Sequence, residues 1–129
     1  MLIASSILNS TVCGSAREQQ ASSPSASALA WQEHFEAAQA AQKNQDYVAA
    51  EREYRSVLQL KPDFAEVHMN LGLILHLQGR REEAMGEFRK ALTLKPTLAG
   101  ANFFLGVNYC QLGDGKRAIA YLKAAALPT

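Results

Sequence analysis

Few residues of this chain have the type and spacing that catalysis requires. Gly113-Asp114-Gly115-Lys116 resembles part of a phosphate-binding loop, but such a loop needs a longer glycine-to-lysine spacing and a preceding strand. We therefore interpret this segment as a turn between two helices. No serine or cysteine occupies a recognisable nucleophile turn, so the sequence predicts no catalytic residue and a protein that is not an enzyme.

The histidines and cysteines do not form a metal-ligand pattern. His68 and His76 are about two helical turns apart, but no acidic or thiol partner stands at a matching spacing. His34 and His68 are 34 residues apart, which indicates equivalent places in a repeat. Cys13 and Cys110 are too far apart to indicate a metal knuckle or a disulfide framework, and Cys110 is expected to pack inside a helix bundle. We predict no metal and no cofactor.

Composition excludes several classes of protein. Thirteen lysines and arginines balance twelve aspartates and glutamates, leaving a formal charge of +1, whereas nucleic-acid binders usually carry a basic excess on one face. The 129 residues suffice for one domain with a real core, and no run of 18 apolar residues suggests a transmembrane span. A small globular domain is expected.

Residues 1–26 differ from the rest of the chain. They are serine-rich, with Arg17 and Glu18 as their only charges, and they hold too little apolar surface to offset the entropy of ordering. We expect a disordered tail. The alternative is a degenerate export signal, because Met1 to Leu8 is mostly apolar and small residues follow at Gly14-Ser15-Ala16. The compartment stays open between the cytoplasm and export.

The remainder repeats with a period of 34 residues. The recurring positions are Pro62 and Pro96, Leu71-Gly72 and Leu105-Gly106, Gly79 and Gly113, Ala50, Ala84 and Ala118, and Tyr54, Phe88 and Leu122. Such a period indicates a repeat architecture, in which each unit buries its apolar face only by stacking on its neighbours.

Each unit is predicted to contain two helices. In the middle unit, Asp63 is expected to cap the first helix, with Glu66 completing the cap. Gly79 ends that helix by adopting a left-handed backbone. A second helix is expected over 81–94, ended by Lys95 because the residue before a proline avoids helical geometry.

The close contact between the paired helices has its own residue signature. Gly72 and Ala84 are small where the two axes must approach, and Phe88 is expected to fill the space that remains.

This pattern of Leu-Gly, aromatic, alanine and proline positions resembles the tetratricopeptide repeat family. The resemblance covers units of about 31–64, 65–98 and 99–129, within a domain of residues 27–129, although Ala37 and Ala38 replace Leu-Gly in the first unit. It implies an all-α fold, in which antiparallel helix pairs stack as a right-handed solenoid. The solvating helix that normally covers the last unit has no counterpart here, so either the natural chain continues or another surface covers that end.

By this resemblance, the first helices of the units line a concave face, which binds a peptide or helix of a protein partner. We predict the partner-binding residues to be Phe35, Gln39, Met69, Asn70, Leu73, His76, Phe103 and Val107. An apolar groove of this kind suits an amphipathic helix or an extended apolar peptide. The alternative is that several of these side chains only pack against neighbouring helices.

Two further readings of the function stay open. The chain can be an accessory segment of a larger enzyme or assembly machine, or it can self-associate as a homo-oligomer through its uncapped last unit. The sequence names neither the partner nor the pathway, because a fold alone does not specify them.

Overall fold

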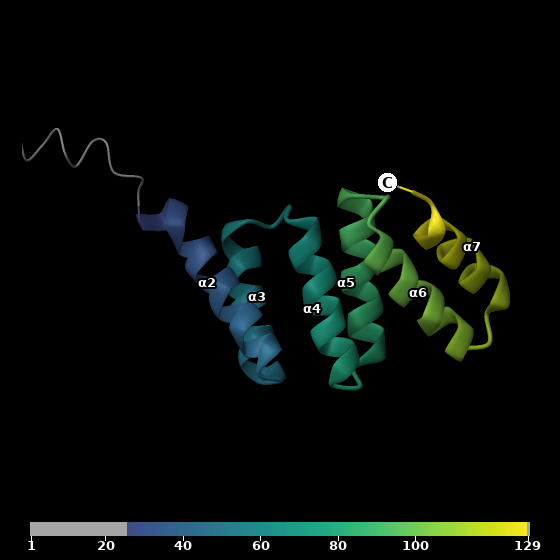
Figure 1. Ribbon diagram of the computed structural model, residues 1–129, viewed down its shortest axis with the longest axis horizontal. Helices are drawn as coiled ribbons and strands as arrows, with labels where there is room; N and C mark the ends of the chain where they lie inside the picture. The colour runs from purple at the N-terminus through teal and green to yellow at the C-terminus, as the bar shows by residue number, and fades with distance from the viewer. Residues whose placement is uncertain (1–25, 129) are drawn as a thin grey trace, which may run out of the picture.

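The computed structural model describes residues 26–128, which form a row of antiparallel helix pairs (Figure 1). The helices are α2 (Ala26–Lys43), α3 (Tyr47–Leu60), α4 (Ala65–Leu77), α5 (Arg81–Leu94), α6 (Ala99–Gln111) and α7 (Gly115–Ala126). Within each pair the two helices pack on each other, and α3 packs on α4 as α5 packs on α6. The predicted all-α solenoid is confirmed. The predicted tail or export signal lies outside the described residues, except for Ala26, which is the first residue of α2.

The turns inside the second and third units follow the prediction. Gly79 and Gly113 both have a φ of 78°, a left-handed conformation that glycine adopts at little cost. Asp114, directly after Gly113, caps α7 by accepting a hydrogen bond from the backbone N–H of Arg117 at 3.1 Å. The segment predicted to be a turn rather than a phosphate loop is therefore a helix-to-helix turn. The predicted second helix of the middle unit also has the observed bounds of α5.

The start of α4 differs from the prediction. Asp63 does not cap this helix, since the N-cap residue is Phe64 and no side chain hydrogen-bonds to the cap. The Phe64 ring stacks on Phe35 with centroids 5.7 Å apart, and the Phe64 carbonyl oxygen accepts the first backbone hydrogen bonds of the helix, from Val67 and His68. The Glu66 carboxylate instead accepts a hydrogen bond from Lys95 at 2.9 Å.

The predicted close contact inside the helix pairs is confirmed. A Cβ atom added to Gly72 would lie 2.6 Å from the Phe88 ring, and one added to Gly106 would lie 2.6 Å from Leu122. Ala84 is fully buried. Only hydrogen at these two glycines allows α4 and α6 to come this close to their partner helices.

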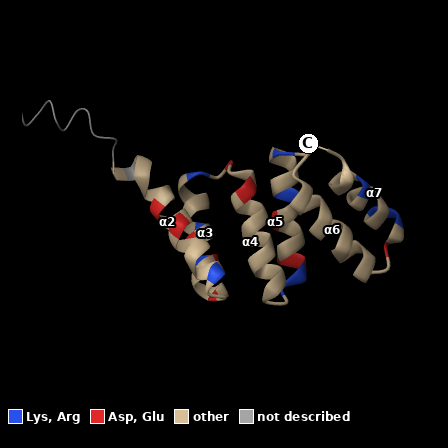
Figure 2. Ribbon diagram, viewed as in Figure 1, with Lys and Arg blue, Asp and Glu red and all other residues tan. Residues whose placement is uncertain are grey.

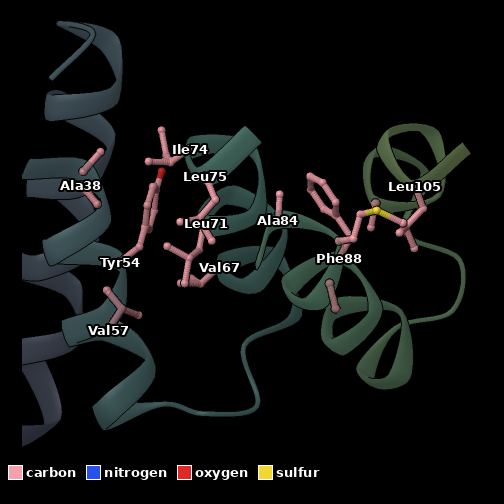
Figure 3. Packing of buried hydrophobic residues seen from close by; sticks show 14 of the residues in the cluster. Ala38, Tyr54, Val57, Val67, Leu71, Ile74, Leu75, Ala84, Phe88 and Leu105 are labelled. Atoms are coloured by element: carbon pink, nitrogen blue, oxygen red, sulfur yellow. The ribbon is translucent and has the colours of Figure 1, made fainter. Parts of the chain in front are cut away.

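One buried cluster runs through the units and joins them. Figure 3 shows Tyr54 of α3 pointing toward Leu71 and Ile74 of α4, while Phe88 of α5 lies on the side of Leu105 in the next unit. All five side chains are buried. In the first two units the second helix thus presents a large ring to its own unit and to the first helix of the next, which makes the row of helices one stack.

Candidate functional site

The surface formed by α2, α4 and α6 is the first-helix face, and much of it carries no charge. Neither lysine, arginine, aspartate nor glutamate occurs in α6, and Glu66 is the only one of these in α4. Figure 2 accordingly shows both helices almost entirely tan. Since a surface helix normally presents charged side chains to water, an uncharged exposed surface indicates a place where another molecule binds.

An exposed aromatic ring stands on this face. Phe103 is 49% exposed, and its ring meets Phe104 edge-on with centroids 5.4 Å apart. Phe104 in turn stacks on the buried Phe88, at 5.4 Å and 9° between the planes, and the His76 ring lies 5.9 Å from the Phe104 ring. The exposed ring therefore packs edge-on against an aromatic stack that reaches the core.

Apolar side chains of α4 and α6 extend this surface. Met69, Leu73 and Val107 are all half-buried. The Met69 sulfur fills the space beside Gly100, where a Cβ atom would lie only 2.6 Å from it. Met69 therefore bridges the two first helices, and its flexible thioether can adapt to different contacts.

A polar hollow of about 410 Å³ lies toward the other end of the face. Its lining residues are Gln39, Gln42, Lys43, Tyr54 and Asn70. The Tyr54 hydroxyl donates a hydrogen bond to the Gln42 amide oxygen at 2.6 Å, and burial raises the pKa of that hydroxyl while the Asn70 side chain offsets part of the rise. The hollow therefore offers amides that both donate and accept, beside one ammonium group.

The predicted partner-binding residues divide into groups. The hollow brings together Gln39 and Asn70, and His76 and Phe103 both contact the Phe104 ring. Phe35 does not line the hollow, although it stands one helical turn before Gln39 in α2. It is half-buried, and its ring packs against Phe64 and Tyr54, so most of its surface belongs to the core.

Sequence reasoning did not single out Lys43 and Tyr54 for this site. Lys43 stands one helical turn after Gln39, and that spacing of four residues was an available signal. Tyr54 occupies the repeat position that Phe88 and Leu122 hold in the other units, a position that indicates a large apolar side chain rather than a binding residue. Its ring is in the core, while its hydroxyl reaches the hollow.

A histidine–glutamate pair recurs in the first two units. His68 Nδ1 lies 2.7 Å from the Glu87 carboxylate, and His34 Nδ1 lies 2.6 Å from Glu53, each pair 19 residues apart. The predicted equivalence of the two histidines is confirmed. In the second unit, the other ring nitrogen of His68 is 2.8 Å from the carbonyl oxygen of Pro62. Because both ring nitrogens face acceptors, this histidine has no free nitrogen to exchange a proton with a substrate.

The Glu87 carboxylate is a buried charge with two partners. Burial by itself raises its pKa, but hydrogen bonds from His68 and Lys90 together bring the pKa below the ordinary value. Lys90 donates to the second carboxylate oxygen at 2.9 Å. The pair is therefore a structural link between α4 and α5.

The prediction that Cys110 is packed inside the bundle is wrong, because its side chain is exposed. It lies on the side of α6 that no other described helix covers. Within residues 26–128, no cluster of three or more potential metal-ligating side chains occurs, and no helix is long and apolar enough to cross a membrane.

Comparison with known proteins identifies the repeat. The family model described as "Tetratricopeptide repeat" matches residues 35–99. The peroxisomal targeting signal receptor of Candida albicans is 38% identical over 69 residues, which is 54% of this chain and 12% of that protein. The human protein O-mannosyl-transferase TMTC2 is 46% identical over 48 residues, 37% of this chain and 6% of that protein. The chain thus spans only a small part of either relative.

Solved structures agree with the fold. The crystal structure of MamA superposes with a TM-score of 0.71 at 22% identity, covering 75% of this chain and 57% of MamA. A mutant O-GlcNAc transferase from Thermobaculum terrenum has a TM-score of 0.71 at 30% identity, covering 80% of this chain and 20% of that enzyme.

Proposed function

We propose that this chain, which belongs to the tetratricopeptide repeat family, is a non-catalytic module that binds a peptide or helix of a protein partner on the first-helix face. The family resemblance makes this the concave face of the solenoid. The observation that carries the proposal is the exposed Phe103 ring, held on a packed aromatic base in an uncharged surface.

The two ends of the face suit different parts of one ligand. At the polar hollow, the amides of Gln39 and Asn70 can donate to and accept from a peptide backbone. At the other end, Phe103, Leu73 and Val107 suit apolar side chains of the ligand. We assign the contact to the eight residues expected from the sequence: Phe35, Gln39, Met69, Asn70, Leu73, His76, Phe103 and Val107. Phe35 contributes least, because the core already holds most of its ring.

The binding mechanism is presentation by a preformed surface. The helices that bear these side chains are fixed by the buried cluster that runs through all units. A partner therefore loses its own freedom on binding, while the receptor loses little.

The test is selection of peptides from a random display library on the full chain. Phe103→Glu places a charge where an apolar side chain should dock, and Val48→Glu is the matched control, because Val48 is 75% exposed on α3, away from this face. We expect selected peptides to bind wild type and Val48→Glu alike and to lose at least about tenfold in affinity on Phe103→Glu. Equal binding to all three proteins would place the site elsewhere.

A second candidate is an accessory segment within a larger enzyme or assembly machine. It is supported by the small fraction of each relative that the chain spans, 12% and 6%, and by the transferase names of the human relative and of the 30% identical structure. An immunoblot of the native protein tests it. A band far above 14.1 kDa supports this candidate, and a band near 14.1 kDa contradicts it.

A further inference from the structure

The outer side of α7 carries apolar side chains that the described residues leave uncovered or cover only in part. We call it the end face: Ile119 and Ala126 are exposed there, and Leu122 and Ala125 are half-buried, with Leu122 also packing against Gly106 of α6. Ile119 is 56% exposed, whereas Met85, the residue 34 positions earlier in α5, is 4% exposed. Leu122 is half-buried, whereas its counterpart Phe88 is fully buried. The end face therefore repeats a surface that is covered elsewhere in the same molecule.

The two covered junctions indicate which kind of element fits such a surface. In each, the first helix of the next unit packs on the preceding second helix, α4 on α3 and α6 on α5. The buried stripes of these helices share a spacing of i, i+4, i+7: they are Val67, Leu71 and Ile74 in α4, and Ala101, Leu105 and Asn108 in α6. A helix with a mainly apolar stripe of this spacing is thus the element that this surface accommodates.

Charge selects among such helices. Three basic residues, Lys116, Arg117 and Lys123, lie in α7, and this helix contains no aspartate or glutamate. Asp114, just before α7, lies 3.5 Å from Arg117, while neither Lys116 nor Lys123 makes an ion pair with another residue of 26–128. A partner with acidic side chains beside its apolar stripe gains attraction here, and a basic partner is repelled.

The first helix of a second copy fits this surface poorly. The stripe of α2 at the equivalent positions consists of Glu33, Ala37 and Ala40, and all three are exposed. This stripe offers a charge and two methyl groups where α4 has valine, leucine and isoleucine. A polar outer helix is typical of the solvated end of a repeat array, so the two ends of this stack are not alike.

We propose that the end face binds an amphipathic helix of a partner protein, with apolar residues at i, i+4 and i+7 and acidic residues beside them. This site is separate from the first-helix face, so either site can fail in its test without the other.

A peptide with the sequence of residues 63–78 is a suitable probe. It contains the α4 stripe together with Asp63 and Glu66, so it combines the apolar spacing with acidic side chains. Fluorescence anisotropy of the labelled peptide, titrated with the full 129-residue chain, measures binding. We expect saturable binding that Ile119→Glu weakens by at least about tenfold, the scale of one buried aliphatic side chain.

Four comparisons show which residues of the protein and of the peptide account for the binding. Ile119→Ser repeats the test without adding a charge, and far-UV circular dichroism checks that both variants keep their helices. A peptide with Leu71→Ser and Ile74→Ser should lose binding. A peptide with Asp63→Lys and Glu66→Lys should bind severalfold more weakly, with a difference that shrinks as salt is raised. Phe103→Glu in the protein should leave the affinity unchanged.

Three outcomes would overturn the proposal. The first is no saturable binding of the peptide. The second is an affinity that Phe103→Glu lowers and Ile119→Glu does not, which would place the peptide on the first-helix face. The third is a sedimentation mass that doubles with concentration and returns to that of a monomer in Ile119→Glu, which would make a second copy the occupant.

Discussion

Replacing Gly72 with alanine should destabilise this protein although alanine is the better helix former. The added Cβ would lie 2.6 Å from Cε1, 2.8 Å from Cδ1 and 3.1 Å from Cζ of Phe88, whereas ordinary van der Waals contact begins at 3.4 Å. The Phe88 ring is fully buried and stacks on Phe104. It cannot move aside without displacing α6, so the contact between α4 and α5 must open.

The expected cost follows from two opposing effects. Alanine in place of a helical glycine gains about 0.5–1 kcal/mol, and overpacking a filled core costs typically about 1–3 kcal/mol. Because three atoms of one immobile ring are involved, we expect the clash to dominate. The net loss in the free energy of unfolding should be about 1–2 kcal/mol.

Gly86 supplies the matched control. It lies inside α5, its φ is not positive, and a Cβ there meets nothing within 4 Å. Gly86→Ala should therefore raise the free energy of unfolding by about 0.5–1 kcal/mol. Urea denaturation followed by circular dichroism at 222 nm measures both variants under the same conditions.

The test is whether the two variants change the free energy of unfolding in opposite directions. If Gly72→Ala and Gly86→Ala changed stability in the same direction and by similar amounts, the close approach of α4 and α5 would not be a constraint. The assignment of Gly72 and Phe88 as the contact that sets the helix pair would then be refuted.

Two further predictions concern buried polar groups. The pKa of Glu87 is held below its unfolded value of 4.5, so its stabilising contribution is present above that pH and is lost as the pH falls through the folded pKa. Glu87→Gln should therefore cost about 1–3 kcal/mol at neutral pH and much less in acid, as urea titrations at several pH values would show; a cost independent of pH would contradict this. The amide oxygen of Asn108 is buried and has no hydrogen-bond partner among residues 26–128, and Ile74 occupies the equivalent place in α4. Asn108→Val should raise the melting temperature and the free energy of unfolding by up to about 1 kcal/mol, and a lower melting temperature would show that the amide is needed.

Much of the candidate site could be located from the sequence, and its chemistry only in part. The family resemblance assigned Phe103, Leu73 and Asn70 to the first helices of their units, and the structure places them in α6 and α4. The period of 34 residues makes Phe103 equivalent to Met69 and Leu73 equivalent to Val107. The sequence did not show which of the candidate side chains would pack in the core and which would be exposed. Phe35 is drawn into the core by Phe64, and Cys110 is exposed, because burial depends on whether a neighbouring helix covers the position.

The sequence by itself determined the repeat, the turns inside the second and third units and the bounds of α5. These depend on local chemistry: Gly79 and Gly113 permit a left-handed backbone, and Pro96 stops the helix before it. The start of α4 shows the limit of such rules. The polar Asp63 was a plausible cap, but the N-cap residue is Phe64, whose ring stacks on Phe35 of the neighbouring unit's first helix.

Only the tertiary structure decided which of two equivalent repeat positions is buried and which is exposed. Met85 and Ile119 are both apolar residues at the same place in their units, yet the next helix covers one and no described residue covers the other. The polar hollow likewise exists because α2, α3 and α4 bring Gln39, Tyr54 and Asn70 together. The local sequence determines which side chains a helix carries on each of its faces. The stacking of whole units determines which of those side chains are covered, because it brings together residues that are far apart along the chain.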